Sequence, residues 1–117
     1  MSLSTHVLDA SLGRPARGVP IVLSRGDGTA AVPVFSPIIT AFTDSDGRYR
    51  YQQDGRDVQL PAGVYELTFD TAAYFAASGQ TGFYPKVTVT FEITDAAMHH
   101  HVPLLLSPFA FSTYRGS

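Results

Sequence analysis

The chain has 117 residues, of which 44% are hydrophobic and only 15% are charged, and its formal net charge is −2. This length suits one domain with its own core, so we expect residues 1–117 to form a single domain. The weak negative charge, without a Lys/Arg cluster, excludes a nucleic-acid-binding surface, and the lack of an apolar run of about 20 residues excludes a membrane-spanning helix.

The scarcity of charged side chains also bears on assembly. Globular domains typically have about 25% charged residues, and a chain with fewer has little polar material to cover its surface. We therefore expect subunits to associate and bury apolar surface. The sequence has no cysteine, which excludes disulfides and thiolate metal sites, and its start lacks the pattern of a secretion signal. A cytoplasmic location is expected on these grounds.

The first half of the chain predicts three strands joined by turns. Residues 3–9 and 19–24 predict the first two strands, and residues 38–43 predict the third. Pro33 and Pro37 argue against a central strand within residues 30–39, because proline cannot donate to a sheet ladder. The glycine-rich residues 25–29 are interpreted as a turn, since no helix follows that would bind phosphate.

The segment TDSDGR at residues 43–48 is similar at its start to a calcium-binding loop. The remaining ligands of such a loop are missing and no helices flank the segment. A tight turn is therefore predicted, because Asp and Gly accommodate a sharp bend. Arg48 then begins a short extended run.

The second half of the chain predicts a helix between strands. Residues 63–70 and 86–94 alternate apolar and polar side chains, as half-exposed strands do. Residues 71–78 are rich in alanine and predict the one helix, with Asp70 or Thr71 as its capping residue.

Two apolar runs, at residues 102–107 and 109–114, predict the last strands, which a Ser-Pro break separates. The total is seven or eight short strands at regular spacing with one short helix. This pattern is typical of an all-β fold, an antiparallel β-sandwich.

Candidates for chemistry are His6, Arg48, His99, His100, His101 and Arg115. Because successive strand residues point to opposite faces, only His99 and His101 of the histidine run can converge. With His6 they would form a three-nitrogen zinc site, an alternative that we weigh against a site without metal. In a site without metal, two imidazoles would exchange protons near neutral pH and two guanidiniums would hold a planar anion. That equipment fits hydrolysis of a ring amide by activated water.

Several segments carry a resemblance to a known family. They are LSTHVLD at 3–9 followed by GRPARGVPI, TDSDGR at 43–48, AGVYELTFD at 62–70 and HVPLLLSPFAFSTYRGS at 101–117. On these motifs, which cover nearly the whole chain, the sequence resembles the transthyretin-like family. The closing Tyr-Arg-Gly-Ser is similar to the ending of the family's 5-hydroxyisourate hydrolases and separates them from its thyroid-hormone carriers.

The resemblance implies a transthyretin-like antiparallel β-sandwich of about eight strands with one short helix. It also implies a homotetramer, formed as a dimer of dimers, with active sites at the dimer–dimer interface. The implied reaction opens 5-hydroxyisourate to 2-oxo-4-hydroxy-4-carboxy-5-ureidoimidazoline in urate degradation, with no metal or cofactor. A non-catalytic carrier of small aromatic ligands is the alternative.

The resemblance also assigns roles to residues. The implied catalytic residues are His6, Arg48 and His101, and the implied substrate-binding residues are Arg48, Tyr114, Arg115, Gly116 and Ser117. Either histidine would serve as the base that activates water.

Two features depart from the family. Residues 26–37 are longer and more apolar than in many members. Position 100 is often tyrosine, and His100 would perturb the titration of His101 if the two rings were close.

Overall fold

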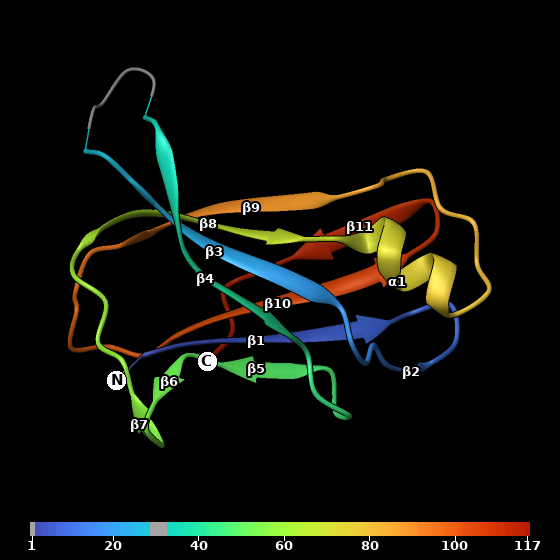
Figure 1. The fold of residues 1–117 in the computed structure, drawn as a ribbon, viewed down its shortest axis with the longest axis horizontal. Helices are drawn as coiled ribbons and strands as arrows, with labels where there is room; N and C mark the ends of the chain where they lie inside the picture. Colours follow the sequence, from blue (N-terminus) through green and yellow to red (C-terminus); the bar gives the residue numbers. More distant parts are fainter. Residues whose placement is uncertain (1, 29–32) are drawn as a thin grey trace.

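Two β-sheets share one hydrophobic core and form the body of the protein (Figure 1). The computed structural model describes residues 2–28 and 33–117. The first sheet, called the β1 sheet below, contains in order β11 (Ala110–Thr113), β10 (His100–Ser107), β1 (Leu3–Asp9) and β2 (Arg14–Pro15), and β5 (Arg48–Arg50) also pairs with β1. The second sheet contains in order β4 (Phe35–Phe42), β3 (Pro20–Gly26), β8 (Gly63–Phe69) and β9 (Val87–Ile93).

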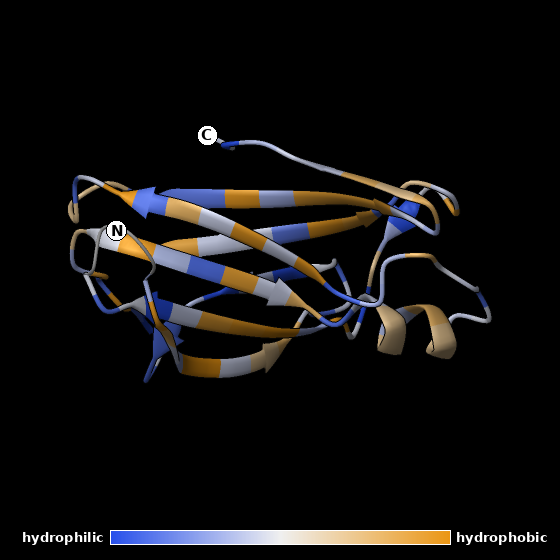
Figure 2. Cartoon of the chain, turned by 90° about the horizontal axis from the view of Figure 1, so that it is seen from above, coloured by the Kyte–Doolittle hydropathy of each residue, from blue (hydrophilic) through white to orange (hydrophobic). Residues whose placement is uncertain are grey.

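A small hairpin and one helix complete these elements. The hairpin pairs β6 (Gln52–Gln53) with β7 (Arg56–Asp57), and the helix is α1 (Thr71–Ala77). The helix lies at one end of the sandwich, and the N terminus lies at the opposite end (Figures 1 and 2). The architecture confirms the predicted all-β sandwich with one short helix. One detail differs, because β1 pairs with β10 in parallel.

Alternation along the strands explains the two layers. In β8, the side chains of Tyr65, Leu67 and Phe69 are at most 1% exposed, as their period-two spacing predicts. Figure 2 shows the same alternation of hydrophobic and hydrophilic residues along other strands. The predicted inward and outward faces of this segment are therefore confirmed.

Strand β4 carries Pro37 and lies at an edge of its sheet. Strand β4 begins at residue 35 rather than near 38, and it pairs with β3 alone. Its register shifts between Leu23 and Ser24, next to the residue paired with Pro37. An edge strand tolerates the missing backbone donor. The predicted turn at 25–29 and the apolar segment 26–37 fall partly on residues outside the described ranges.

The helix begins where its capping residue predicts. The Asp70 carboxylate accepts a hydrogen bond from the Ala73 N–H at 3.0 Å, which satisfies a free donor of the first turn. The helix then buries Tyr74 and Phe75 against the sandwich. In the described part of the chain, no helix has the length and apolar character needed to cross a bilayer.

Asp9, the last residue of β1, connects the β1 sheet to this helix. Its carboxylate is almost fully buried and accepts a hydrogen bond from the Tyr74 hydroxyl at 2.5 Å. Burial alone would raise the pKa of Asp9, but hydrogen bonds outweigh it and lower this pKa to about 2; the donors are Tyr74, the Leu12 N–H, Gln80 and Ser11. Burial and the Asp9 carboxylate together raise the pKa of Tyr74 to about 12.

The β1 sheet has one face in the core and one face outside it. Strand β1 buries Leu3, Thr5, Val7 and Asp9, whereas the alternate residues Ser4, His6 and Leu8 are only half-buried. We call the face that carries Ser4 and His6 the outer face of the β1 sheet. His6, His99, His101 and Arg48 are arranged on this face.

Candidate active site

Strand pairing brings His6 and Arg48 together. Strands β1 and β5 are antiparallel, and their register sets His6 directly opposite Arg48. Directly opposed residues share one face, with Cβ atoms about 4.5–5.5 Å apart. An imidazole and a guanidinium from segments distant in the sequence thus become neighbours on the outer face.

The TDSDGR segment forms the tight turn that the sequence predicts. The Asp44 carboxylate accepts hydrogen bonds from the N–H groups of Asp46 and Arg48, both at 2.9 Å. Gly47 has φ of +72°, and its carbonyl accepts the Val7 N–H at 2.7 Å. A Cβ at this position would overlap the Val7 carbonyl oxygen, so the turn requires glycine to dock on β1.

The second histidine, His101, lies on the same face through the parallel pairing of β1 with β10. That register sets His101 opposite Ser4. The Ser4 hydroxyl oxygen is 2.8 Å from Nδ1 of His101 and 2.8 Å from Nε2 of His99. The predicted convergence of His99 and His101 is therefore confirmed, with Ser4 between them.

The environment keeps these imidazoles neutral at pH 7. Burial is the largest cause that lowers the pKa of His101, and Arg48, His99 and His6 lower it further, while the Ser4 backbone opposes them. Burial and the nearby Arg50 lower the pKa of His99. The face therefore concentrates positive charge on guanidiniums and leaves the imidazoles free to donate or accept single protons.

His100 belongs to the opposite face of β10. It is buried, and its Nδ1 lies 3.1 Å from the carbonyl oxygen of Met98. The histidines that lower the pKa of His101 are His99 and His6. The substitution at position 100 therefore does not have the proximity to His101 on which its expected effect depended.

The C-terminal tail returns to the site through Gly116. Its N–H donates a hydrogen bond to the His101 carbonyl at 2.9 Å, and the two residues form an antiparallel bridge. A Cβ at Gly116 would overlap Cδ2 of the His101 ring and would lie 3.2 Å from Cγ of Pro103. Gly116 therefore packs against one edge of the imidazole, while Ser4 contacts the other edge.

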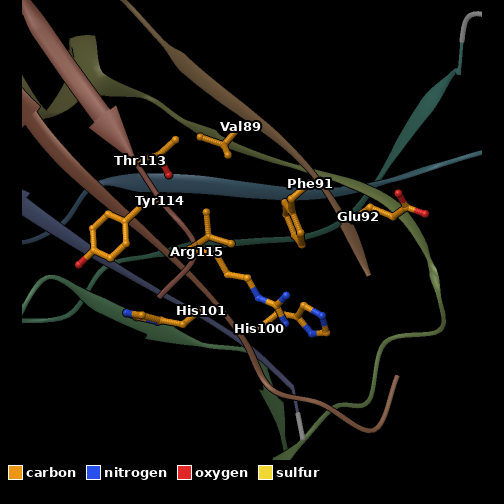
Figure 3. Close-up of a pocket in the computed structure, with 9 residues that line it drawn as sticks. Val89, Phe91, Glu92, His100, His101, Thr113, Tyr114 and Arg115 are labelled. Carbon is orange, nitrogen blue, oxygen red and sulfur yellow. The ribbon is translucent and has the colours of Figure 1, made fainter. Parts of the chain in front are cut away.

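Arg115 lies in the tail between β11 and the bridge at Gly116, and it is exposed. It lines a pocket of about 360 Å³ between β9 and the tail, with Phe91, Glu92, His100 and His101. Figure 3 shows Arg115 reaching toward His100 while the His101 imidazole points the other way. The structure thus brings His6, Arg48, His101 and Gly116 together, and Arg115 shares a pocket with His101 while its guanidinium extends toward His100 (Figure 3).

The remaining tail residues are exposed. The Tyr114 side chain is 59% exposed and also lines the Arg115 pocket, and Ser117 at the chain end is exposed. Ser4 is not among the residues that the sequence predicted for the site, although its spacing of two from His6 places both on one strand face. That spacing was the signal available for finding it.

The three-histidine metal alternative is not supported. Within residues 2–28 and 33–117, no group of three or more His, Asp or Glu side chains has an arrangement that would hold a metal ion. His99 and His101 instead contact the Ser4 hydroxyl.

These features define a β-sandwich protein with an imidazole–guanidinium site on one sheet face, suited to proton transfer on an anionic ligand. The family model described as HIUase/Transthyretin family matches residues 3–116. The chain belongs to this family.

Individual relatives agree with this assignment. The mouse (Mus musculus) protein named 5-hydroxyisourate hydrolase is 44% identical over 115 residues, which cover 98% of this chain and 94% of the mouse protein. The Arabidopsis thaliana "Uric acid degradation bifunctional protein TTL" is 43% identical over 98% of this chain, and the chain spans 37% of that protein's length.

Solved structures of two kinds share the fold. The 5-hydroxyisourate hydrolase of Klebsiella pneumoniae superposes with a TM-score of 0.82 at 38% identity, with 100% of each chain covered. Sea bream transthyretin in complex with thyroxine superposes with a TM-score of 0.84 at 33% identity, with 99% of this chain and 95% of that chain covered. Overall shape alone therefore does not separate a hydrolase from a carrier.

Proposed function

We propose that this protein hydrolyses 5-hydroxyisourate to 2-oxo-4-hydroxy-4-carboxy-5-ureidoimidazoline, a step of urate degradation. The main support is the outer face of the β1 sheet, where His6 lies opposite Arg48 and His101 is held between Ser4 and Gly116. The names of the mouse and Klebsiella relatives support the same activity.

The proposed reaction uses the residues of this face without a cofactor. One imidazole, of His6 or His101, takes a proton from water, and the water oxygen bonds to a ring carbonyl carbon. Arg48 holds the urate-like oxygens and stabilises the negative charge that develops on the carbonyl oxygen. The carbon–nitrogen bond then breaks as a proton is delivered to the departing nitrogen.

The tail residues have proposed parts in substrate binding. Gly116 seats the tail on His101, and Gly116 and Ser117 are proposed to bind substrate there. Tyr114 and Arg115 are proposed to contact substrate from the tail. Arg48, which lies directly opposite His6, is proposed as the main cation of the site.

The proposed assembly is a homotetramer, a dimer of dimers, in which the outer faces meet. Support comes from the half-buried apolar side chains of Leu8 and Leu105, which flank the polar site, and from the low charge content. A second subunit over this face would exclude water from the reaction. A cytoplasmic location is proposed with it.

The alternative is a non-catalytic carrier of small aromatic ligands. The likeness to thyroxine-bound sea bream transthyretin supports the carrier alternative, with a TM-score similar to that of the Klebsiella hydrolase. The paired His6 and Arg48 argue for chemistry, because a carrier needs no proton-transfer group.

The test is to generate 5-hydroxyisourate in situ from urate and to follow its ultraviolet absorbance with and without the protein. We expect decay faster than the spontaneous reaction, in proportion to protein concentration. Decay at the spontaneous rate, together with saturable binding of an aromatic ligand, would favour the carrier.

A further inference from the structure

The Ser4 hydroxyl joins two imidazoles in one short chain of hydrogen bonds. Its oxygen is 2.8 Å from His99 Nε2 and 2.8 Å from His101 Nδ1. A serine hydroxyl has a single hydrogen to donate. The Ser4 hydroxyl therefore donates to one ring and accepts from the other. The hydrogen bonds run either from His99 through Ser4 to His101 or in the reverse direction.

The surroundings of His99 select the direction. Its other nitrogen, Nδ1, is buried and has no hydrogen-bond partner among the described residues. A buried N–H without an acceptor is rarer in proteins than an under-used acceptor, because the lost bond costs free energy. The hydrogen of His99 is therefore on Nε2, where it donates to Ser4. Ser4 in turn donates to Nδ1 of His101.

The groups that face these rings keep the chain neutral. His101 is approached by His6 from β1, Arg48 from β5 and His99 from its own segment. His99 is approached by Arg50, Asp57 and His100. Burial and the nearby guanidiniums lower the pKa of both rings, and only Asp57 opposes this at His99. Each ring then carries one hydrogen at pH 7.

We propose that Ser4 and His99 are positioning residues that fix His101 in the tautomer with its hydrogen on Nε2. This proposal rests on the proposed function. The tautomer divides the work of the two histidines: His101 donates a hydrogen bond to the carbonyl oxygen that gains charge, and His6 is the base. The contacts of the His101 ring agree with this tautomer. Ser4 contacts Nδ1 and Gly116 covers Cδ2, which leaves Nε2 available to substrate.

The proton count balances with this assignment. His6 takes one proton from water as the water oxygen bonds to the carbonyl carbon. The carbon–nitrogen bond breaks, and His6 returns that proton to the departing nitrogen. The second proton of water leaves as the new carboxylic acid ionises. His101 keeps its hydrogen throughout, as a neutral imidazole donor does.

The test reads the tautomer directly, by nitrogen-15 NMR of the histidine rings in the full-length protein without substrate, with His101→Gln to assign the signals. At pH 7 we expect His101 to be neutral with its hydrogen on Nε2. Ser4→Ala and His99→Phe should give a mixture of tautomers, and Ser4→Thr, which keeps the hydroxyl, should restore one. Ser36→Ala, on distant β4, is the matched control and should change nothing.

Kinetics supply the second readout. Ser4→Ala should lower kcat at least about tenfold with little change in KM and a shifted pH profile, and Ser4→Thr should recover it. A hydrogen on Nδ1 of His101 in the unaltered protein, or an imidazolium at pH 7, would overturn the proposal. Failure of the unaltered protein to hydrolyse 5-hydroxyisourate would refute the proposed function separately, since the NMR result does not depend on activity.

Discussion

Replacing Gly116 with alanine tests how the tail completes the site. The new Cβ would overlap Cδ2 of His101, and Pro103 blocks an escape because its Cγ would be 3.2 Å away. Ordinary contact requires the tail and the ring to separate by roughly 1 Å, a misplacement on the scale that costs about a hundredfold in rate. We expect Gly116→Ala to lower kcat/KM by about that factor.

Stability should respond much less than activity. The variant loses at most the hydrogen bond from Gly116 to the His101 carbonyl, which is worth about 1 kcal/mol net. The assay is 5-hydroxyisourate decay, paired with urea unfolding. Gly79→Ala is the matched control, because Gly79 has φ of +71° and open space around its Cβ position. It should lose about 1 kcal/mol of stability and keep full activity. Full activity in Gly116→Ala would refute the claim that the tail positions His101.

Three further predictions follow from the site and the core. Arg48→Ala should lower kcat/KM about a hundredfold and Arg115→Ala less than about tenfold, because Arg48 lies directly opposite His6 whereas Arg115 is exposed on the tail; equal losses would contradict this division. Asp9 should contribute about 2 kcal/mol of stability above pH 4, lost as the pH falls from 3.8 toward 2, since its pKa is lower in the folded protein. Acid titration of unfolding should show this slope, and it should shrink in Tyr74→Phe. Treatment with a chelator should leave activity unchanged; a loss restored by zinc would revive the metal alternative.

Local rules predicted most of the fold. Alternation identified the buried residues of β8, and the expected cap at Asp70 or Thr71 located the start of α1. These predictions succeed because each depends on a few residues that are neighbours in the sequence. The parallel pairing of β1 with β10 was not predicted, because a pairing between residues about 97 positions apart leaves no local pattern.

The site was predicted in part for the same reason. The resemblance supplied His6, Arg48 and His101, which the strand register brings to one face. It did not supply Ser4, whose role depends on contacts across the sheet. It also supplied Arg115, which lines a pocket with His101 and extends toward His100 in the single chain.

The most direct measurement compares 5-hydroxyisourate decay for the full chain and for a chain ending at Thr113, at equal concentration and with the oligomeric state checked for both. The outer face keeps His6 and Arg48 in the shortened chain, but it loses the residue that packs on His101. We predict rapid decay with the full chain and spontaneous decay with the shortened one. Spontaneous decay with the full chain would contradict the hydrolase assignment, and rapid decay with both would contradict the part given to the tail.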